Sequence, residues 1–192
     1  MDHFRKIDTL TVLIIAVLGL YGGKVTVFYM VYLFWFQELI RTLIDFSYLF
    51  WRKKGIVQKL DFIKQSFGSF FILWIYVVFI VLLFGLMLNW GHQQLIADNM
   101  MILLFRNWYF NINLLLFFAE YTYFRSKADN TDLQLQIFNS RHIILHISII
   151  LGAMIQLAIL PRLKVSDNQL VSILTVIPFL LLKFFMDKPK IS

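Results

Sequence analysis

Long apolar runs separated by short polar connections dominate the chain. Most of the runs are close to the roughly 20 residues with which a helix crosses the hydrocarbon core of a bilayer. Six runs stand out, at residues 9–21, 25–51, 67–90, 100–124, 143–160 and 170–186. The pattern predicts an all-α fold: a polytopic transmembrane helix bundle of six spans that occupies residues 1–192 as a single domain.

The first run is shorter than the others. Gly22, Gly23 and Lys24 follow it, and the second run begins immediately afterwards. We interpret the first run as one arm of a tight helical hairpin. The alternative is a cleaved signal peptide, but no small-residue cleavage pattern follows the run.

The basic residues are unevenly shared among the connections between runs. Cytoplasmic loops of membrane proteins carry an excess of Lys and Arg, so the richer connections should face the cytoplasm. These richer segments include the two ends of the chain, and they hold Arg5, Lys6, Arg52, Lys53, Lys54, Lys59, Arg125, Lys127, Arg141, Lys188 and Lys190. The alternate connections hold only Lys24, Arg162 and Lys164. Both termini are therefore predicted to be cytoplasmic.

The composition agrees with a membrane protein. Apolar residues make up 60% of the chain and aromatic residues 18%, whereas a soluble domain keeps more polar surface for water. Because the Lys and Arg residues stand between apolar runs, we attribute the net charge of +7 to topology and contact with anionic lipid. We expect membrane lipid as a partner, and no nucleic acid. The chain has no Cys, which excludes disulfides, thiol nucleophiles, iron–sulfur clusters and thiolate metal sites.

Three ionisable residues of the second run share one face of the predicted helix. Glu38, Arg41 and Asp45 are spaced three and four residues apart, and charged groups in hydrocarbon are costly. One interpretation is a binding site in which Glu38 carries protons and Arg41 holds an anion. The other is a self-neutralising triad that only holds the bundle together.

The fourth run has a polar residue at every seventh position. These residues are Arg106, Asn113 and Glu120. In an otherwise apolar helix, such a stripe should face protein or water rather than lipid. Hydrogen bonding between helices is the alternative explanation.

Two His residues lie one helical turn apart at the start of the fifth run. His142 and His146 can chelate a divalent metal ion if a third ligand arrives from another helix, so they are the candidate metal ligands. The alternative is a neutral His146 that is hydrogen-bonded to a carboxylate. In the sixth run, Lys183 and Asp187 are four residues apart, which is typical of a pair that snorkels to the membrane surface.

The predicted topology gathers most of these groups on one side of the membrane. Spans two, four and six descend toward the cytoplasm, while spans three and five rise from it. If the helices pack with their polar faces inward, the cytoplasmic half contains a polar cluster or an open cavity. The candidate binding residues are Glu38, Arg41, Asp45, Glu120, Arg141, His142, His146, Lys183 and Asp187.

Four short motifs occur in order along the chain. They are Trp35–Glu38 (similar to Tyr-Trp-x-Glu), Ser66–Trp74 (similar to His-Tyr-Gly-x-Phe-x-x-x-His), Arg141–His146 ahead of Gly152 (similar to Arg-x-x-x-x-His before a Gly) and Lys183–Asp187 (similar to Lys-x-x-x-Asp). Together they resemble the bacterial integral membrane family catalogued as domain of unknown function 6498, over Tyr32 to Asp187. The resemblance implies a helix bundle in the bacterial cytoplasmic (inner) membrane, and it implies no activity.

The chain departs from this family's pattern at several His positions. Ser66 and Trp74 stand where the family tends to have His, and Glu120 stands where a Ser-His pair is usual. If the family's His residues bind a metal, this chain has lost several of the ligands.

Three kinds of function are compatible with the polar cluster. The sequence favours a protein that binds or moves a small polar solute, an ion or a lipid headgroup. Six spans are few for a solitary transporter, although a homo-oligomer would supply further spans. The alternative is a structural or accessory subunit whose buried charges orient helices or dock a membrane partner. A membrane enzyme with His146 as base or metal ligand is the third, and the sequence has no recognised nucleophile or complete ligand set for it.

Overall fold

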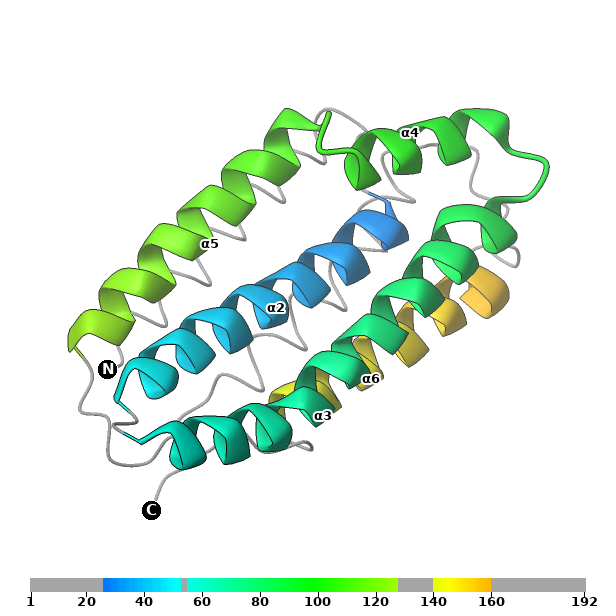
Figure 1. The fold of residues 1–192 in the computed structure, drawn as a ribbon. Helices are drawn as coiled ribbons and strands as arrows, with labels where there is room; N and C mark the ends of the chain where they lie inside the picture. The colour runs from blue at the N-terminus through cyan, green and yellow to red at the C-terminus, as the bar shows by residue number, and fades with distance from the viewer. Residues whose placement is uncertain (1–25, 53–54, 128–139, 160–192) are drawn as a thin grey trace, which may run out of the picture.

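A computed structural model describes residues 26–52, 55–127 and 140–159 (Figure 1). Within these ranges the chain is helical and contains no strand, which confirms the predicted all-α class there. The helices are α2 (Val27–Arg52), α3 (Ile56–Ile80), α4 (Gln93–Leu103), α5 (Trp108–Lys127) and α6 (Ser140–Met154). Three shorter segments extend α3 and α6: the π-helical η1 (Val81–Leu86), the 3₁₀ turn η2 (Met87–Asn89) and the π-helical η3 (Ile155–Ile159). The predicted runs at 9–21 and 170–186 lie outside the described residues.

Three helical stretches are long and apolar enough to cross a membrane, which indicates a membrane protein. They are Val27–Trp51, Val57–Asn89 and Gln93–Lys127. Exposed Trp side chains stand at the ends of the first two stretches, with Trp51 at one end of the molecule and Trp90, directly after Asn89, at the other (Figure 1). Trp residues at the two ends are typical of the aromatic belts at the two membrane–water interfaces.

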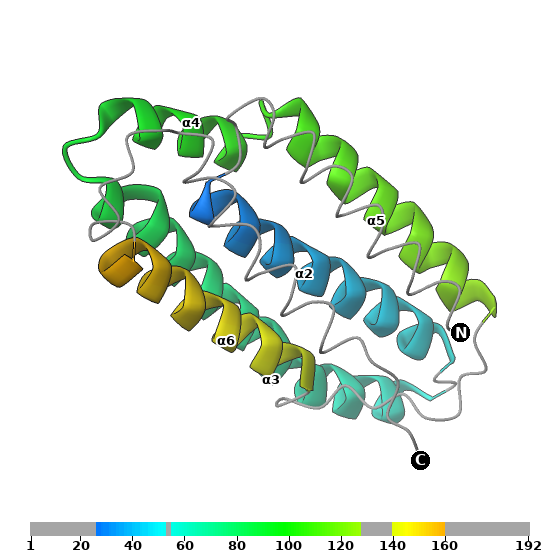
Figure 2. The same cartoon turned by 180° about the vertical axis from the view of Figure 1, so that it is seen from behind.

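Helix α2 lies in the middle of the bundle (Figure 1). It contacts α5 on one side and α3 and α6 on the other. Seen from behind, α6 passes in front of α3 (Figure 2), and the Tyr76 hydroxyl of α3 lies 3.3 Å from His146 Nδ1 of α6. The colours along the chain show that α2 and α5 run in one direction and α3 and α6 in the opposite one.

The first half of α2 is enclosed on every side. Residues 27–35 are all buried, and nine consecutive residues cover more than two helical turns. Aromatic rings fill this region: the ring of Tyr32 stacks on Trp35 and on Phe110 of α5, at centroid distances of 5.8 and 5.5 Å. The indole of Trp35 also donates a hydrogen bond of 2.7 Å to the Leu73 carbonyl of α3. Hence α2 is a core helix rather than a lipid-facing one.

Helix α3 has one apolar face turned outward and one turned inward. The inward face includes Ser66, Leu73 and Ile80, which are all buried. The exposed large apolar side chains of the outward face recur at helical spacing at Phe67, Phe71, Trp74 and Val78, and the stripe continues into η1 at Leu82. An apolar stripe of this length is suited to contact with lipid chains.

The π-helical turn at the end of α3 leaves a backbone carbonyl to be matched by side chains. The Phe84 carbonyl accepts hydrogen bonds from the amide nitrogens of Asn89 (2.7 Å) and Asn99 (3.2 Å). Asn99 accepts in turn from the Thr26 hydroxyl (2.9 Å), which itself receives the backbone N–H of Tyr29. These bonds tie the start of α2 to α4 and to the end of α3.

The predicted fourth run, residues 100–124, is not one continuous helix. Helix α4 ends in a Schellman motif, in which the Arg106 amide donates to Met101 and the Phe105 amide to Ile102. Phe105 occupies the left-handed position with φ = 58°, which usually belongs to Gly. A non-Gly residue costs about 1–2 kcal/mol there.

The start of α5 is equally well defined. The Asn107 side chain caps the helix by accepting the Phe110 amide at 3.1 Å. The Asn111 side chain donates to the Phe105 carbonyl at 2.7 Å. The break therefore satisfies its own backbone groups, as a discontinuity at membrane depth must.

We predict that Gly152→Val destabilises the bundle. A Cβ atom on Gly152 of α6 would lie 3.0 Å from Val27, 3.1 Å from Phe84 and 3.1 Å from Val31, so an added side chain must push three buried groups apart. Overpacking of this kind costs about 1–3 kcal/mol. Thermal unfolding of the purified protein in detergent should show a lower Tm. Gly55→Ala is the control, since its Cβ would meet only the Gln58 side chain at 3.9 Å; equal Tm values for the two variants would contradict the prediction.

Candidate functional site

Polar side chains gather on α2 between Gln37 and Asp45. Gln37, Glu38, Thr42 and Asp45 are buried there, and Arg41 is half-buried. Polar and charged groups in a membrane helix are costly unless other groups match them. The partners of this helix therefore decide what these residues can do.

Asp45 is matched by two residues of α5. The Tyr121 hydroxyl lies 2.9 and 3.0 Å from the two carboxylate oxygens, and it donates its single hydrogen to them. Arg125 Nε lies 3.1 Å from Asp45 Oδ1, and both side chains are only 4% exposed. A charged pair this far from water requires close geometry to offset desolvation.

The guanidinium group of Arg41 rests on aromatic rings of α5. Its central carbon lies 5.0 Å from the ring centroid of Phe117 and 5.8 Å from that of Tyr121. A cation over an aromatic face is stabilised by the ring quadrupole, more so where water is scarce. Arg125 likewise lies 5.7 Å from the ring of Tyr48 on α2.

These contacts define one site, which we call the α2–α5 seam. Its residues come from successive turns of two helices that run in the same direction, as the four-residue spacing on each helix requires. The seam consists of Arg41 and Asp45 of α2 and Phe117, Tyr121 and Arg125 of α5. Apolar groups surround it, including Ile44 and Phe124.

Several buried polar atoms near the seam make no hydrogen bond within the described part of the chain. Arg125 Nη2, Gln37 Nε2 and Thr122 Oγ1 are of this kind. The Nε of Arg125 is also not aligned for a hydrogen bond, so its contact with Asp45 is an ion pair. The seam thus saturates the Asp45 carboxylate but leaves the donors of Arg125 incompletely matched.

Among the predicted site residues, the structure brings Arg41 and Asp45 into the seam. It places Glu38 in the buried part of α2 and Glu120 half-buried on α5. Lys183 and Asp187 lie outside the described residues. The side chains of Arg141 and His142 do as well, although their backbones belong to α6.

His146 is exposed, and its Nδ1 contact is with the phenol of Tyr76. The expected carboxylate partner is not the group found at Nδ1. In the ranges that the structure describes, no three His, Cys, Asp or Glu residues are grouped so as to hold a metal ion.

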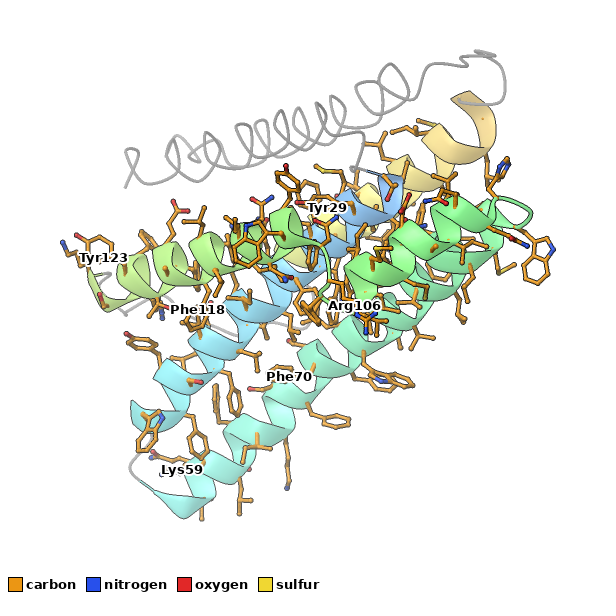
Figure 3. The ribbon with its side chains drawn as sticks, turned by 90° about the horizontal axis from the view of Figure 1, so that it is seen from above. Tyr29, Lys59, Phe70, Arg106, Phe118 and Tyr123 are labelled. Atoms are coloured by element: carbon orange, nitrogen blue, oxygen red, sulfur yellow. The ribbon has the colours of Figure 1, made fainter. Side chains whose placement is uncertain are left out.

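The predicted polar stripe of the fourth run is wrong at its first position. Arg106 is exposed in the break between α4 and α5, so it shares no helix face with Asn113 and Glu120. Figure 3 shows Arg106 beside that break and Tyr123 at the opposite end of α5. Asn113 donates a 2.9 Å hydrogen bond to the Tyr29 hydroxyl of α2, which confirms interhelical hydrogen bonding at that position.

Sequence reasoning missed the role of Arg125. It was treated as a loop charge that reports topology, yet it lies in the last turns of α5 and is buried. The signal that could have found it is the four-residue spacing of Phe117, Tyr121 and Arg125, which places two rings and a cation on one helix face.

The two positions that differ from the His motif have unlike surroundings. Ser66 is buried, and its hydroxyl donates to the Phe62 carbonyl at 2.7 Å. Trp74 is 63% exposed on the outward face of α3. The two side chains therefore do not share a site.

Comparison of the chain with protein-family models, with curated proteins and with solved structures finds no match. The chemistry of the seam must therefore be interpreted from its own geometry.

We predict that Asp45→Asn and Arg125→Gln each destabilise the protein strongly. Each leaves a buried partner uncompensated, which costs about 3–5 kcal/mol. The free energy of unfolding of the double variant should fall by less than the sum of the two single losses, because the two side chains contact each other. Asp61→Asn is the control, since this exposed Asp of α3 should change the free energy of unfolding by about 0.5 kcal/mol or less. Denaturant unfolding in detergent provides the measurement, and strictly additive losses would show that the two residues are not coupled.

Proposed function

We propose that the chain is a multi-pass protein of a bacterial cytoplasmic membrane, and that it binds or moves a small polar solute, an ion or a lipid headgroup. The α2–α5 seam is the site. The proposed topology has six spans, including those predicted at 9–21 and 170–186, with both termini in the cytoplasm. The motifs that resemble domain of unknown function 6498 support the bacterial origin.

The observation that carries the proposal is the incompletely matched arginine of the seam. Arg125 is buried, one side of its guanidinium group faces Asp45, and Nη2 has no hydrogen-bond partner in the described ranges. A buried unmatched donor costs about 1–3 kcal/mol. Buried polar groups without a hydrogen-bond partner are rare in folded proteins, and a bound ion or ligand is one explanation for them.

The distribution of basic residues supports a cytoplasmic position for the seam. Lys127 stands at the end of α5, and Lys59 stands at the start of α3, which lies at the same end of the bundle (Figures 1 and 3). Lys127 donates to the Tyr123 hydroxyl there. An excess of Lys and Arg at this end fits the cytoplasmic side.

A second function, as a structural or accessory membrane subunit, is favoured by one specific observation. Tyr121 and Arg125 engage both oxygens of Asp45, so the carboxylate is already satisfied within the chain. A satisfied pair orients helices and needs no ligand. On this hypothesis, the buried charges fix the packing of α5 against α2, and a membrane partner docks on the outer faces.

Cysteine labelling tests the proposed orientation. The chain has no Cys, so each engineered Cys is labelled without background. Gln58 and Gln94 are exposed residues in the first turns of α3 and α4, at opposite ends of the bundle. In intact cells, a membrane-impermeant maleimide should label Gln94→Cys, and it should label Gln58→Cys only after permeabilisation. The reverse pattern would invert the topology.

The same chemistry tests whether the seam admits water and solute. Gln37 is buried one turn before Arg41, whereas Leu43 is exposed on the outer surface of α2. Because the reactive thiolate needs water, a polar thiol reagent added from the cytoplasmic side should modify Gln37→Cys well before Leu43→Cys. Equal protection of both would reject the binding function and leave the structural one.

A further inference from the structure

Helix α5 carries two buried donors, one turn apart, that no group in the described residues matches. They are Arg125 Nη2 and Thr122 Oγ1. The hydroxyls of Ser47, Ser66 and Ser126 each donate to a backbone carbonyl about one turn earlier, at 2.8, 2.7 and 2.8 Å. Thr122 lies in the same kind of helix and makes no such bond. Its hydroxyl is therefore a buried donor without a hydrogen-bond partner among the described residues.

Arg125 is held in a fixed position. Asp45 contacts Nε and the ring of Tyr48 lies beside the guanidinium group, while the buried Nη2 has no hydrogen-bond partner among the described residues. A guanidinium group has donors and no acceptor, and its planar fork matches the paired oxygens of phosphate and carboxylate. A ligand for this position must supply acceptor atoms.

We propose that Arg125 Nη2 and Thr122 Oγ1 together bind a phosphate group at the cytoplasmic end of α5. This inference rests on the proposed function and narrows its ligand to an oxyanion. The phosphate belongs either to an anionic phospholipid or to a free phosphate compound. Both donor atoms are covered in the structure, so the ligand displaces the groups that cover them, and the contact is screened little by salt.

The test uses the full-length protein, purified in neutral detergent. Thermal unfolding is measured with inorganic phosphate and with chloride at matched ionic strength. Native mass spectrometry of nanodiscs that contain phosphatidylglycerol or phosphatidylcholine then reports retained lipid. Thr122→Val removes the hydroxyl at nearly constant volume, and we expect it to weaken phosphate binding about tenfold or more.

Two control variants are used: one retains the hydroxyl at position 122, and the other removes a different hydroxyl. Thr122→Ser retains the hydroxyl and should bind like the wild type. Ser126→Ala removes an exposed hydroxyl of the same helix end and should also bind normally. If Thr122→Val fails to fold, Arg125→Lys takes its place, since it preserves the charge beside Asp45 and removes the fork.

Each outcome decides the proposal. Stabilisation by inorganic phosphate that is lost in Thr122→Val supports a free phosphate ligand. Selective retention of phosphatidylglycerol that is lost in Thr122→Val supports a lipid ligand. No effect of either probe, or an equal effect on wild type and Thr122→Val, overturns the phosphate site. If Gln37→Cys is still labelled from the cytoplasm in that case, the proposed function survives and only this ligand is rejected.

Discussion

The enclosure of α2 is the constraint on which the rest of the structure depends. This helix is covered by α3, α5 and α6, and its first nine residues have no outward face. Farther along α2, Leu43 is exposed but Asp45 is buried, so the Asp45 carboxylate cannot reach water and a neighbouring helix must match it. Tyr121 and Arg125 meet this requirement for Asp45, and aromatic rings meet it for Arg41. The aromatic richness of the chain thus has a use in the core as well as at the lipid surface.

Much of the helical fold could be predicted from hydrophobic run length, because backbone satisfaction in lipid leaves few alternatives to helices. The second run, 25–51, corresponds closely to α2. The third begins earlier than expected: α3 starts at Ile56, since the polar residues near Asp61 and Lys64 extend the helix beyond the apolar run. Apolarity marks the part of a helix that meets hydrocarbon, and it does not mark the helix end.

The break between α4 and α5 could not be predicted from apolarity. Residues 100–124 contain no Gly or Pro to mark it. Phe105 takes the left-handed position, and the side chains of Asn107 and Asn111 provide the polar matching. The sequence contained that polar signal, but polar residues spaced within an apolar run also fit a continuous helix with one polar face.

The candidate site was predicted in part for a similar reason. Glu38, Arg41 and Asp45 were identified from one helix, whereas the partner residues depend on which helix packs against it. Arg125 is adjacent to a basic loop, and that position concealed its burial. Single-sequence spacing can assign residues to a face, but it does not identify the neighbour of that face.

The parallel course of α2 and α5 has a consequence for biogenesis. Tyr121 is 76 residues beyond Asp45, so the carboxylate enters the membrane well before its partner has been synthesised. At about 5–20 residues per second, translation leaves an interval of roughly 4–15 s. During this interval α3 and α4 are made, and Asp45 has not yet met its partners from α5. The contact between α2 and α5 therefore forms only after the helices between them have been synthesised, which makes the order of synthesis part of how this protein reaches its fold.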